Sequence, residues 1–391
     1  MQKIPMAQAR RFLLTRQGLL GKSPFEGRQG VLDYIHMTGS VQYDPVDVCG
    51  RSHELALFAH VRGYKPEQLA GLLYKDRLLF DYWDKNMCIL PIEDWPAFER
   101  TRAYFRQNGY SREAIDAVRG DVLAYLREHG ATGSQELPLK ATVNWPWAPT
   151  SLSRAALETL YHRGELAIHH KTRTIKSYAL AADCLPGALL NQPDPYPDDA
   201  DHMAWRVLRR IGAIGLLWNR ASDAWLCLEL KADARNAAFE RLADEGRITA
   251  VEVEGKTLWL RSEELERLLA LDAPSRAAKH VRFLPPLDCM LWDRKLIKWM
   301  FGFAYQWEVY TPAAKRQYAH YALPVLYGEG FAGRAELLRK GDALIASRFW
   351  AEEGFRRTQA FDRALIAEAD RLRGFHGLKA LEVLPSFAVK A

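Results

Sequence analysis

The sequence predicts an α+β protein in which tandem winged-helix domains precede a C-terminal β-rich module with barrel-like character. Three observations lead to this fold class. Three times along the chain, at intervals of about 80 to 90 residues, a segment with helical spacing of apolar residues is followed by a pair of β-prone runs. Beyond residue 280 the pattern changes to aromatic and β-branched runs interrupted by glycine. At 391 residues the chain is long enough for roughly two to four compact modules.

The composition favours a globular protein, because 48% of the residues are hydrophobic and 26% are charged. No apolar run of about 18 residues occurs, and the first residues show amphipathic helical spacing rather than a signal-peptide pattern. The five cysteines are widely separated, without the paired spacing of a zinc site or a disulfide framework. We therefore expect a monomer in the reducing cytoplasm, with no membrane association, metal or cofactor.

The first predicted module, residues 1–110, combines helices with a closing hairpin. Apolar residues recur there at helical spacing in four segments, and two further segments have β character. The helical segments are 6–17, 28–38, 51–60 and 66–74, and the β-prone segments are 41–43 and 78–90. This order of elements is typical of a winged helix.

The second predicted module, residues 111–190, shows the same order more clearly. A helix that begins at Ser111 ends near Gly130, and residues 132–137 are expected to form a short second helix. The natural recognition helix is 151–163, where Ser151 and Ser153 are candidate N-caps. Two β-runs follow around a basic turn, at 165–170 and 174–180.

A linker rich in proline and aspartate, residues 191–201, leads into the third predicted module at 197–270. Helices are expected at 204–211 and 233–246, followed by a wing at 248–260 that turns at Glu254 and Gly255. The boundary near 270–280 opens the terminal module, 280–391, which includes a predicted helix at 358–373.

The wing of the second module gathers cationic side chains at a density that a solvated hairpin does not need. The formal net charge of +6 is compatible with an anionic partner, but the position of the charges matters more. Such a turn can place several cations beside DNA phosphates, although a solvated surface remains the alternative. Neighbours on a strand face opposite ways, so the adjacent histidines do not suggest a metal site. The residues are His169, His170, Lys171, Arg173 and Lys176.

A second candidate site is the run Gln42, Tyr43, Asp44, Pro45. The proline biases Asp44 toward extended backbone, in which Gln42 and Asp44 share one face and Tyr43 points into the module. An amide and a carboxylate on one face can hold and polarise a water molecule. The alternative is an Asx turn with an aromatic anchor. Rival carboxylates, which we expect to be structural, are Asp81, Asp84, Asp288 and Asp293.

Segments spread over most of the chain resemble the winged-helix YcaQ family of bacterial DNA glycosylases. They are 40–46, 51–55, 283–288, 291–294 and 310–318. The resemblance implies a C-shaped protein of three winged helices and a β-barrel, with duplex DNA in its concave face. It also implies that Gln42, Tyr43 and Asp44 are the Gln–aromatic–Asp version of the active-site motif. The branch with this motif excises N7-alkylguanines and unhooks nitrogen-mustard crosslinks.

The resemblance assigns chemistry to the motif. Asp44 is expected to be catalytic, by stabilising positive charge on the sugar and activating a water that Gln42 positions. Arg51 and His53, which lie in a resembling segment, are expected to contact duplex DNA together with the wing. No lysine accompanies the motif, so base removal without strand cleavage is predicted.

The sequence is also compatible with two functions other than that of a glycosylase. A non-enzymatic winged-helix regulator of transcription has no need of a carboxylate directed at DNA, because a carboxylate repels phosphates. The second alternative is a scaffold protein that uses its wings for protein contacts. Such a protein should bind DNA weakly and with little dependence on salt.

Overall fold

The N-terminal segment forms the helices that its apolar spacing predicts. Helices α1 (Met6–Arg16), α2 (Gly27–Thr38) and α3 (Ser52–His60) match the predicted segments to within one or two residues. The next predicted helix also forms, but it is α-helical only over α4 (Pro66–Ala70) and widens into a π-helical turn, η1 (Gly71–Lys75). Local sequence therefore determines where this part of the chain is helical.

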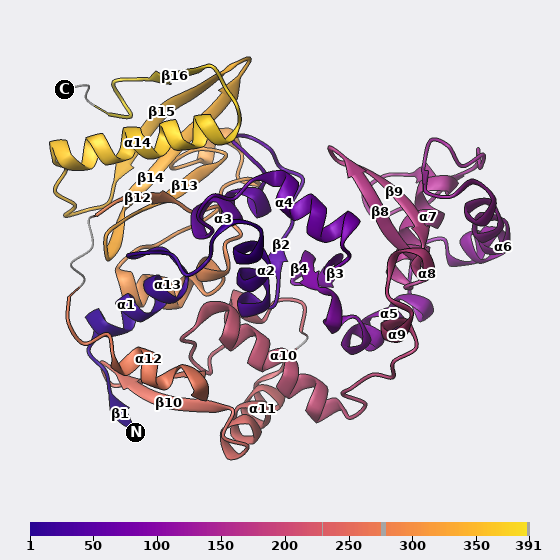
Figure 1. Cartoon of the computed structure of the whole chain (residues 1–391), viewed down its shortest axis with the longest axis horizontal. Helices are drawn as coiled ribbons and strands as arrows, with labels where there is room; N and C mark the ends of the chain where they lie inside the picture. The colour runs from indigo at the N-terminus through magenta and orange to yellow at the C-terminus, as the bar shows by residue number, and fades with distance from the viewer. Residues whose placement is uncertain (229, 275–278, 389–391) are drawn as a thin grey trace. The chain divides into compact units, whose positions relative to one another are not determined.

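The computed structural model describes residues 1–228, 230–274 and 279–388, and the chain divides into two compact units (Figure 1). Unit 1 combines Met1–Gln68 with Met203–Ala391, and unit 2 is Leu69–His202. The segment predicted as the first module, 1–110, contributes to both units. Of the boundary predicted at 270–280, residues 275–278 lie outside the described residues.

The C-terminal part of unit 1 is a five-stranded sheet that curls into a half-barrel, as the β-rich pattern predicts. Neighbouring strands are antiparallel except for the last pair, which is parallel. Register shifts within the second and third strands mark bulges, which bend strands and increase their twist. The strand order is β12 (Val281–Phe283), β13 (Ala322–Tyr327), β14 (Gly330–Lys340), β15 (Ala343–Ala351) and β16 (Ala380–Val383).

Helix α14 (Gln359–Phe375) crosses this sheet and contacts β12, β15 and β16 (Figure 1). The Thr358 hydroxyl caps it by accepting a hydrogen bond from the backbone N–H of Phe361 at 3.2 Å. Its apolar stripe is fully buried, so the helix closes one side of the C-terminal core. That stripe consists of Phe361, Leu365, Ala369 and Leu372.

A second sheet of unit 1 joins the N-terminus to the third predicted module. Helices α10 (Asp199–Ile214) and α11 (Ala232–Asp244) precede a hairpin of β10 (Ile248–Val253) and β11 (Lys256–Arg261). The hairpin turns at Glu254 and Gly255, both with positive φ, as predicted. Strand β1 (Gln2–Lys3) adds to β10 in parallel, which no sequence pattern indicated.

Unit 1 has a core shared by residues from both ends of the chain. Leucines near the end of α1 pack with the segment that follows β12 and with strands β13 and β14. This contact explains why the first 68 residues and the C-terminal sheet form one compact unit. The buried cluster is Leu14, Leu19, Leu20, Ala59, Leu284, Met290, Leu291, Ile297, Phe303, Tyr305, Leu326 and Phe331.

A buried polar pair lies beside this core. The His60 ring contacts the carbonyl oxygen of Gln17 through Nδ1 at 2.6 Å and the carboxylate of Asp288 through Nε2 at 2.7 Å. The Gln17 carbonyl oxygen can only accept a hydrogen bond, so Nδ1 is the donor, and Nε2 shares a second hydrogen bond with the Asp288 carboxyl group. The second oxygen of Asp288 accepts a hydrogen bond from the backbone N–H of Met290 at 3.0 Å.

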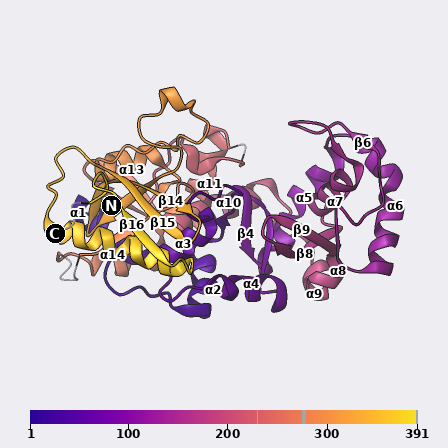
Figure 2. The same ribbon diagram turned by 90° about the horizontal axis from the view of Figure 1, so that it is seen from above.

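Unit 2 packs helices against a small sheet (Figure 2). Hairpin β3 (Leu79–Asp84) and β4 (Asn86–Pro91) and helix α5 (Glu99–Gln107) come first. The described elements that follow are α6 (Arg112–His129), α7 (Leu152–His162) and a sheet in the order β5 (Thr132–Gly133), β9 (Ile175–Leu180), β8 (Leu166–Thr172). The hydroxyl of Ser151, one of the two predicted caps, accepts a hydrogen bond from the Arg154 N–H at 3.3 Å.

The short helix predicted at 132–137 is wrong. Thr132 and Gly133 form strand β5, which pairs with β9, and a turn follows. The Glu136 carboxylate accepts a hydrogen bond from the Gly133 N–H at 2.5 Å, so the side chain closes a tight turn in place of a helical turn.

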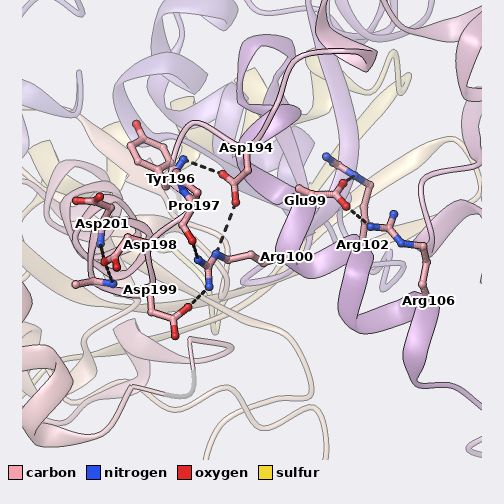
Figure 3. A network of polar contacts seen from close by, with 11 residues as sticks. Glu99, Arg100, Arg102, Arg106, Asp194, Tyr196, Pro197, Asp198, Asp199 and Asp201 are labelled. Atoms are coloured by element: carbon pink, nitrogen blue, oxygen red, sulfur yellow. Dashed lines mark hydrogen bonds and ion pairs between the residues drawn. The ribbon is translucent and has the colours of Figure 1, made fainter.

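The linker predicted at 191–201 is anchored to α5 (Figure 3). The Arg100 guanidinium contacts the carboxylates of Asp194, at 3.6 Å, and of Asp199, and donates to the Pro197 carbonyl oxygen. On the same helix, Glu99 pairs with Arg102 and Arg106. Two of the four aspartates of the linker therefore bind one arginine of α5, a contact that the composition of the linker does not predict.

The remaining described strands and α-helices are short. They are β2 (Val41–Gln42), β6 (Thr142–Val143), β7 (Thr150–Ser151), α8 (Ala181–Cys184), α9 (Gly187–Leu190), α12 (Leu265–Leu269) and α13 (Arg294–Phe301). Among the helices of the described ranges, none combines the length and the apolar character needed to cross a bilayer.

Replacing Asp288 by alanine should destabilise unit 1. The substitution leaves the buried His60 ring and the Met290 N–H without their acceptor, so we expect a loss of about 3 kcal/mol in the free energy of unfolding. Urea unfolding followed by circular dichroism measures it. The control is Asp342→Ala, which removes an exposed pair with Lys379 and should cost less than about 1 kcal/mol. Equal losses in the two variants would contradict the role given to Asp288.

Candidate active site and DNA-contact residues

The segment that carries the predicted motif is fixed at its start by an arginine of α10. Helix α2 ends at Thr38, and the residue that caps it, Gly39, has a φ of 73°. The Arg209 guanidinium donates to the Gly39 carbonyl oxygen at 2.6 Å, and a Cβ at Gly39 would lie only 3.2 Å from that guanidinium. Glycine is therefore required here for both its backbone conformation and its lack of a side chain.

The C-terminal part of unit 1 fixes the end of the same segment. The Arg339 backbone N–H donates to the Val48 carbonyl oxygen at 3.3 Å, and the Arg339 guanidinium pairs with the Asp47 carboxylate. The His376 ring contacts the Cys49 carbonyl oxygen at 2.7 Å. Residues 39–49 are therefore held at both ends by side chains that are far away in sequence.

The two polar residues of the motif lie in different environments. Gln42 is buried, with 6% of its surface exposed, and its Oε1 atom accepts no hydrogen bond from any residue that the structure describes. Asp44 is partly exposed. Its Oδ1 atom accepts a hydrogen bond from the Val46 N–H at 2.7 Å, which is the Asx turn considered as the alternative. The turn and an accessible carboxylate therefore occur together.

Burial sets the protonation behaviour of Asp44. Loss of solvent around the carboxylate raises its pKa above the ordinary value, and the hydrogen bond from Val46 lowers it by less. A carboxylate with a raised pKa is a stronger proton acceptor once it is ionised. This property suits a group that must stabilise positive charge or deprotonate water.

The structure places His53 inside the protein, so exposure gives no support to its expected DNA contact, which stays a prediction. The Tyr43 ring packs on the His53 ring with centroids 4.8 Å apart, and only 6% of His53 is exposed. Tyr43 has the packing role predicted for it. Arg51, the other expected contact, is partly buried with its Nε atom 3.8 Å from the Asp47 carboxylate, so its charge is partly compensated.

A phenol that no sequence pattern indicated lies near Asp44. Tyr321 is 2% exposed, and burial raises its pKa well above the ordinary value, with smaller contributions from Cys49 and Asp44 among others. Its hydroxyl has no hydrogen-bond partner within the described ranges. Tyr321 lies outside the motif and directly before β13, so only the folding of the sheet brings it to this place.

The rival carboxylates are buried, and structural partners are seen for Asp81, Asp288 and Asp293. Asp288 bonds to His60, as described above. Asp293 caps α13 by accepting the Leu296 N–H at 2.8 Å, and its other oxygen accepts the Trp218 Nε1–H at 2.7 Å. Asp81 and Asp84 are 6% and 1% exposed. Of the candidate carboxylates, Asp44 alone is more than marginally exposed to solvent.

Two cations of the predicted basic wing are engaged within unit 2. The Lys171 ammonium pairs with the buried Asp81 carboxylate, which also accepts a hydrogen bond from the Tyr74 hydroxyl at 3.1 Å. Lys176 lies over the Tyr161 ring, 5.8 Å from its centroid, and burial lowers its pKa. Both side chains therefore interact with groups of their own unit, and their expected contact with DNA phosphates stays a prediction.

The adjacent histidines do not face opposite ways as expected, because the strand has a bulge there. The register shifts between Ile168 and His170, and the Nδ1 atoms of His169 and His170 lie 2.9 Å apart. The Arg77 guanidinium supports the bulge by donating to the carbonyl oxygens of Ile168 and His169 at 3.1 Å. Both histidines are exposed, as is Arg173 in the turn.

A family model described as "DNA glycosylase AlkZ-like" matches residues 35–375, which include the motif and both sets of expected DNA contacts. The chain belongs to the AlkZ-like DNA glycosylase family. The protein is therefore a DNA glycosylase, an enzyme that hydrolyses N-glycosyl bonds in DNA, and the resemblance drawn from the sequence is confirmed. Membership of the AlkZ-like family favours this activity over the alternative of a transcriptional regulator.

The fold agrees with the family. The DNA glycosylase AlkZ of Streptomyces sahachiroi matches this chain with a TM-score of 0.65 and 18% sequence identity, covering 98% of this chain and 100% of that one. At such low identity the match shows a shared fold, a mixed α/β structure with a curled half-barrel sheet. The AlkZ-like fold is thus the frame in which Asp44 and its neighbours are placed.

The raised pKa of Asp44 predicts that Asp44→Asn stabilises the protein near neutral pH. A carboxyl with a raised pKa favours folding while it is protonated, and this contribution is lost as the pH rises through the folded-state pKa. Asparagine keeps the acceptor for the Val46 N–H and carries no charge. Thermal unfolding should therefore show a higher midpoint for the variant at pH 7, and no difference below about pH 3.9.

The contrasting variant is Asp47→Asn, three residues further on. It removes an ion pair with Arg339 and should leave the midpoint unchanged or lower it. A lower midpoint for Asp44→Asn at pH 7 would show that the charge of Asp44 stabilises the fold, contrary to this account.

Proposed function

We propose that the protein hydrolyses the N-glycosidic bond of N7-alkylated guanines in duplex DNA and unhooks interstrand crosslinks attached through that atom. The main support is the partly exposed Asp44 carboxylate with its raised pKa. It lies two residues after the buried amide oxygen of Gln42, which accepts no hydrogen bond from any residue that the structure describes. Family membership supplies the reaction class, and the Gln–Tyr–Asp motif supplies the substrate class.

The two side chains match the chemical demands of this substrate. N7-alkylation makes guanine cationic and a good leaving group, so the reaction needs little acid assistance at the base. Positive charge then develops on the sugar, where the Asp44 carboxylate stabilises it. A water attacks C1′ and gives its proton to Asp44, while the Gln42 amide oxygen accepts a hydrogen bond from that water and orients it.

Removal of the base without strand cleavage is part of the proposal. A lyase needs an amine that attacks C1′ and forms a Schiff base. Residues 40–50, which include the motif, contain no lysine. Water is therefore the proposed nucleophile, and an intact abasic strand is the proposed product.

The exposure of Asp44 supports action on crosslinks. A base tethered to both strands cannot move freely into a closed pocket, so the catalytic carboxylate must remain reachable from outside. Asp44 meets this condition, whereas the rival carboxylates do not.

We further propose that groups of helices and hairpins in both units are winged helices that hold the duplex. In unit 2, α7 is the proposed recognition helix and the β8–β9 hairpin its wing. In unit 1, α11 and the β10–β11 hairpin have the same chain order. The four-part division at 1–110, 111–190, 197–270 and 280–391 and a monomeric state remain predictions, as does a cytoplasmic location on chromosomal DNA.

The exposed turn of the β8–β9 hairpin should contribute to DNA affinity. Arg173→Ala should weaken binding to undamaged duplex and reduce the slope of log affinity against log salt by up to about one unit. Fluorescence anisotropy over a salt series measures this slope. Arg356→Ala, which removes an exposed arginine of unit 1, is the control. An unchanged slope for Arg173→Ala would place the phosphate contacts elsewhere.

Catalysis should depend on Asp44 more than on Gln42. We expect Asp44→Asn to slow single-turnover excision of N7-methylguanine by about 100-fold or more, because the charge is lost while the shape is kept. Gln42→Ala should slow it less, since a second water can replace part of the amide. Strand breaks that form after alkali treatment measure excision, because alkali cleaves the DNA at abasic sites. Strand breaks without alkali treatment measure strand cleavage by the protein itself. Duplex affinity should be retained.

The control for this assay is Asp342→Asn, which changes an exposed carboxylate of the C-terminal sheet region. It should excise at the wild-type rate. Excision by Asp44→Asn at that same rate would assign catalysis to another group, and strand breaks before alkali treatment would contradict hydrolysis by water alone.

A further inference from the structure

Unit 2 contains a cavity whose walls are largely aromatic. Its volume is about 440 Å³, within the range of roughly 300–1,000 Å³ typical of small-molecule sites. The walls come from β3, α5, the segment after α5, the segment between β6 and β7, and α7. The lining residues are Trp83, Tyr104, Phe105, Asn108, Gly109, Tyr110, Trp145, Pro146, Thr159 and His162.

The inner wall consists of rings that support one another. The Phe105 and His162 rings are stacked with centroids 4.8 Å apart and planes 23° apart. The Trp83 ring meets both of them edge-on at 6.1 Å. This mutual packing fixes the ring planes before any ligand arrives, which lowers the entropic cost of binding.

The outer wall is aromatic as well and reaches solvent. The Tyr110 and Trp145 rings lie 6.4 Å apart, and Tyr110 and Tyr104 are 52% and 57% exposed. Large aromatic rings at this exposure leave apolar surface in contact with water, a cost that binding of a ligand would remove.

The cavity has polar atoms but no charged side chain among the described residues that line it. Burial lowers the pKa of His162 to about 4, with a smaller contribution from Lys176, so the imidazole is neutral at pH 7. Its ring nitrogens and the Asn108 amide offer both donors and acceptors. A ligand that fits therefore has flat faces and hydrogen-bonding edges, and it needs no ionic partner.

We propose that this cavity binds a single nucleobase, at a site in unit 2 additional to Gln42 and Asp44. A nucleobase has flat π faces for Trp145 and Tyr110, and its edges match neutral donors and acceptors. Stacking of bases on aromatic side chains is a general means of holding unpaired nucleic acid, and it tolerates any sequence. The proposal rests on the DNA substrate of the family and does not depend on the lesion or on the roles of Gln42 and Asp44.

The ligand has two possible sources, an unpaired base still attached to a strand and a free base released by excision. A fluorescein-labelled oligothymidine of eight nucleotides tests the first source by anisotropy. An oligomer of equal length made of abasic sugars has the same backbone charge without bases, so it separates stacking from electrostatics. We expect the thymidine oligomer to bind more tightly.

Ring-deletion variants connect this binding to the cavity. Trp145→Ala and Tyr110→Ala should each weaken binding of the thymidine oligomer by about tenfold, and both rings lie at the solvent-exposed side, where truncation is tolerated. The matched control is Trp147→Ala, because Trp147 is 97% exposed and does not line the cavity. It should change the affinity by less than about twofold.

Competition by free 7-methylguanine and free thymine identifies the source. If a free base displaces the labelled oligomer, the cavity accepts a base that is not attached to a strand. If binding of the oligomer depends on Trp145 but neither free base displaces it, the base must belong to a strand. Either result supports the proposal.

The proposal is overturned if the abasic oligomer binds as tightly as the thymidine oligomer, or if Trp147→Ala loses as much affinity as Trp145→Ala. Performing the titrations with both wild-type and Asp44→Asn protein keeps a failure here distinct from a failure of excision.

Discussion

The imidazole of His60 connects three parts of unit 1 that are far apart in sequence. It lies at the end of α3, contacts the carbonyl oxygen of Gln17 after α1, and pairs with Asp288 just after β12. All three are buried, and the Tyr34 ring of α2 stacks on the imidazole with centroids 4.6 Å apart. A buried pair of this kind tolerates no loss of either partner, so it fixes how the N-terminal helices pack on the C-terminal half-barrel.

This packing determines the environment of the motif. Residues 39–49 are anchored by Arg209, Arg339 and His376, which lie on α10, β14 and just after α14. The anchored segment buries the Gln42 amide oxygen, which accepts no hydrogen bond from a described residue, and it raises the pKa of Asp44. Both features reduce stability, and in the proposed mechanism they supply the reactivity of these two side chains.

The placement of charge in unit 2 illustrates why the number of cations is a weak guide to a DNA surface. The sequence places five cationic or titratable residues within eight positions of one hairpin. The fold uses Lys171 to compensate the buried Asp81 and packs Lys176 on Tyr161, which leaves His169, His170 and Arg173 at the surface. Arginines are used in the same way elsewhere, for example Arg100 at the linker.

The sequence by itself determined most of the helices, the hairpins, the half-barrel pattern and the family, because periodicity, turn residues and motif letters are local properties. It also pointed to Gln42 and Asp44. Tertiary structure alone decided that His53 and Lys171 face inward, that 132–137 is a strand and a turn, and that Tyr321 lies near Asp44. These outcomes depend on burial and on partners such as Asp81, which are chosen by contacts between distant segments and leave no periodic trace in the sequence.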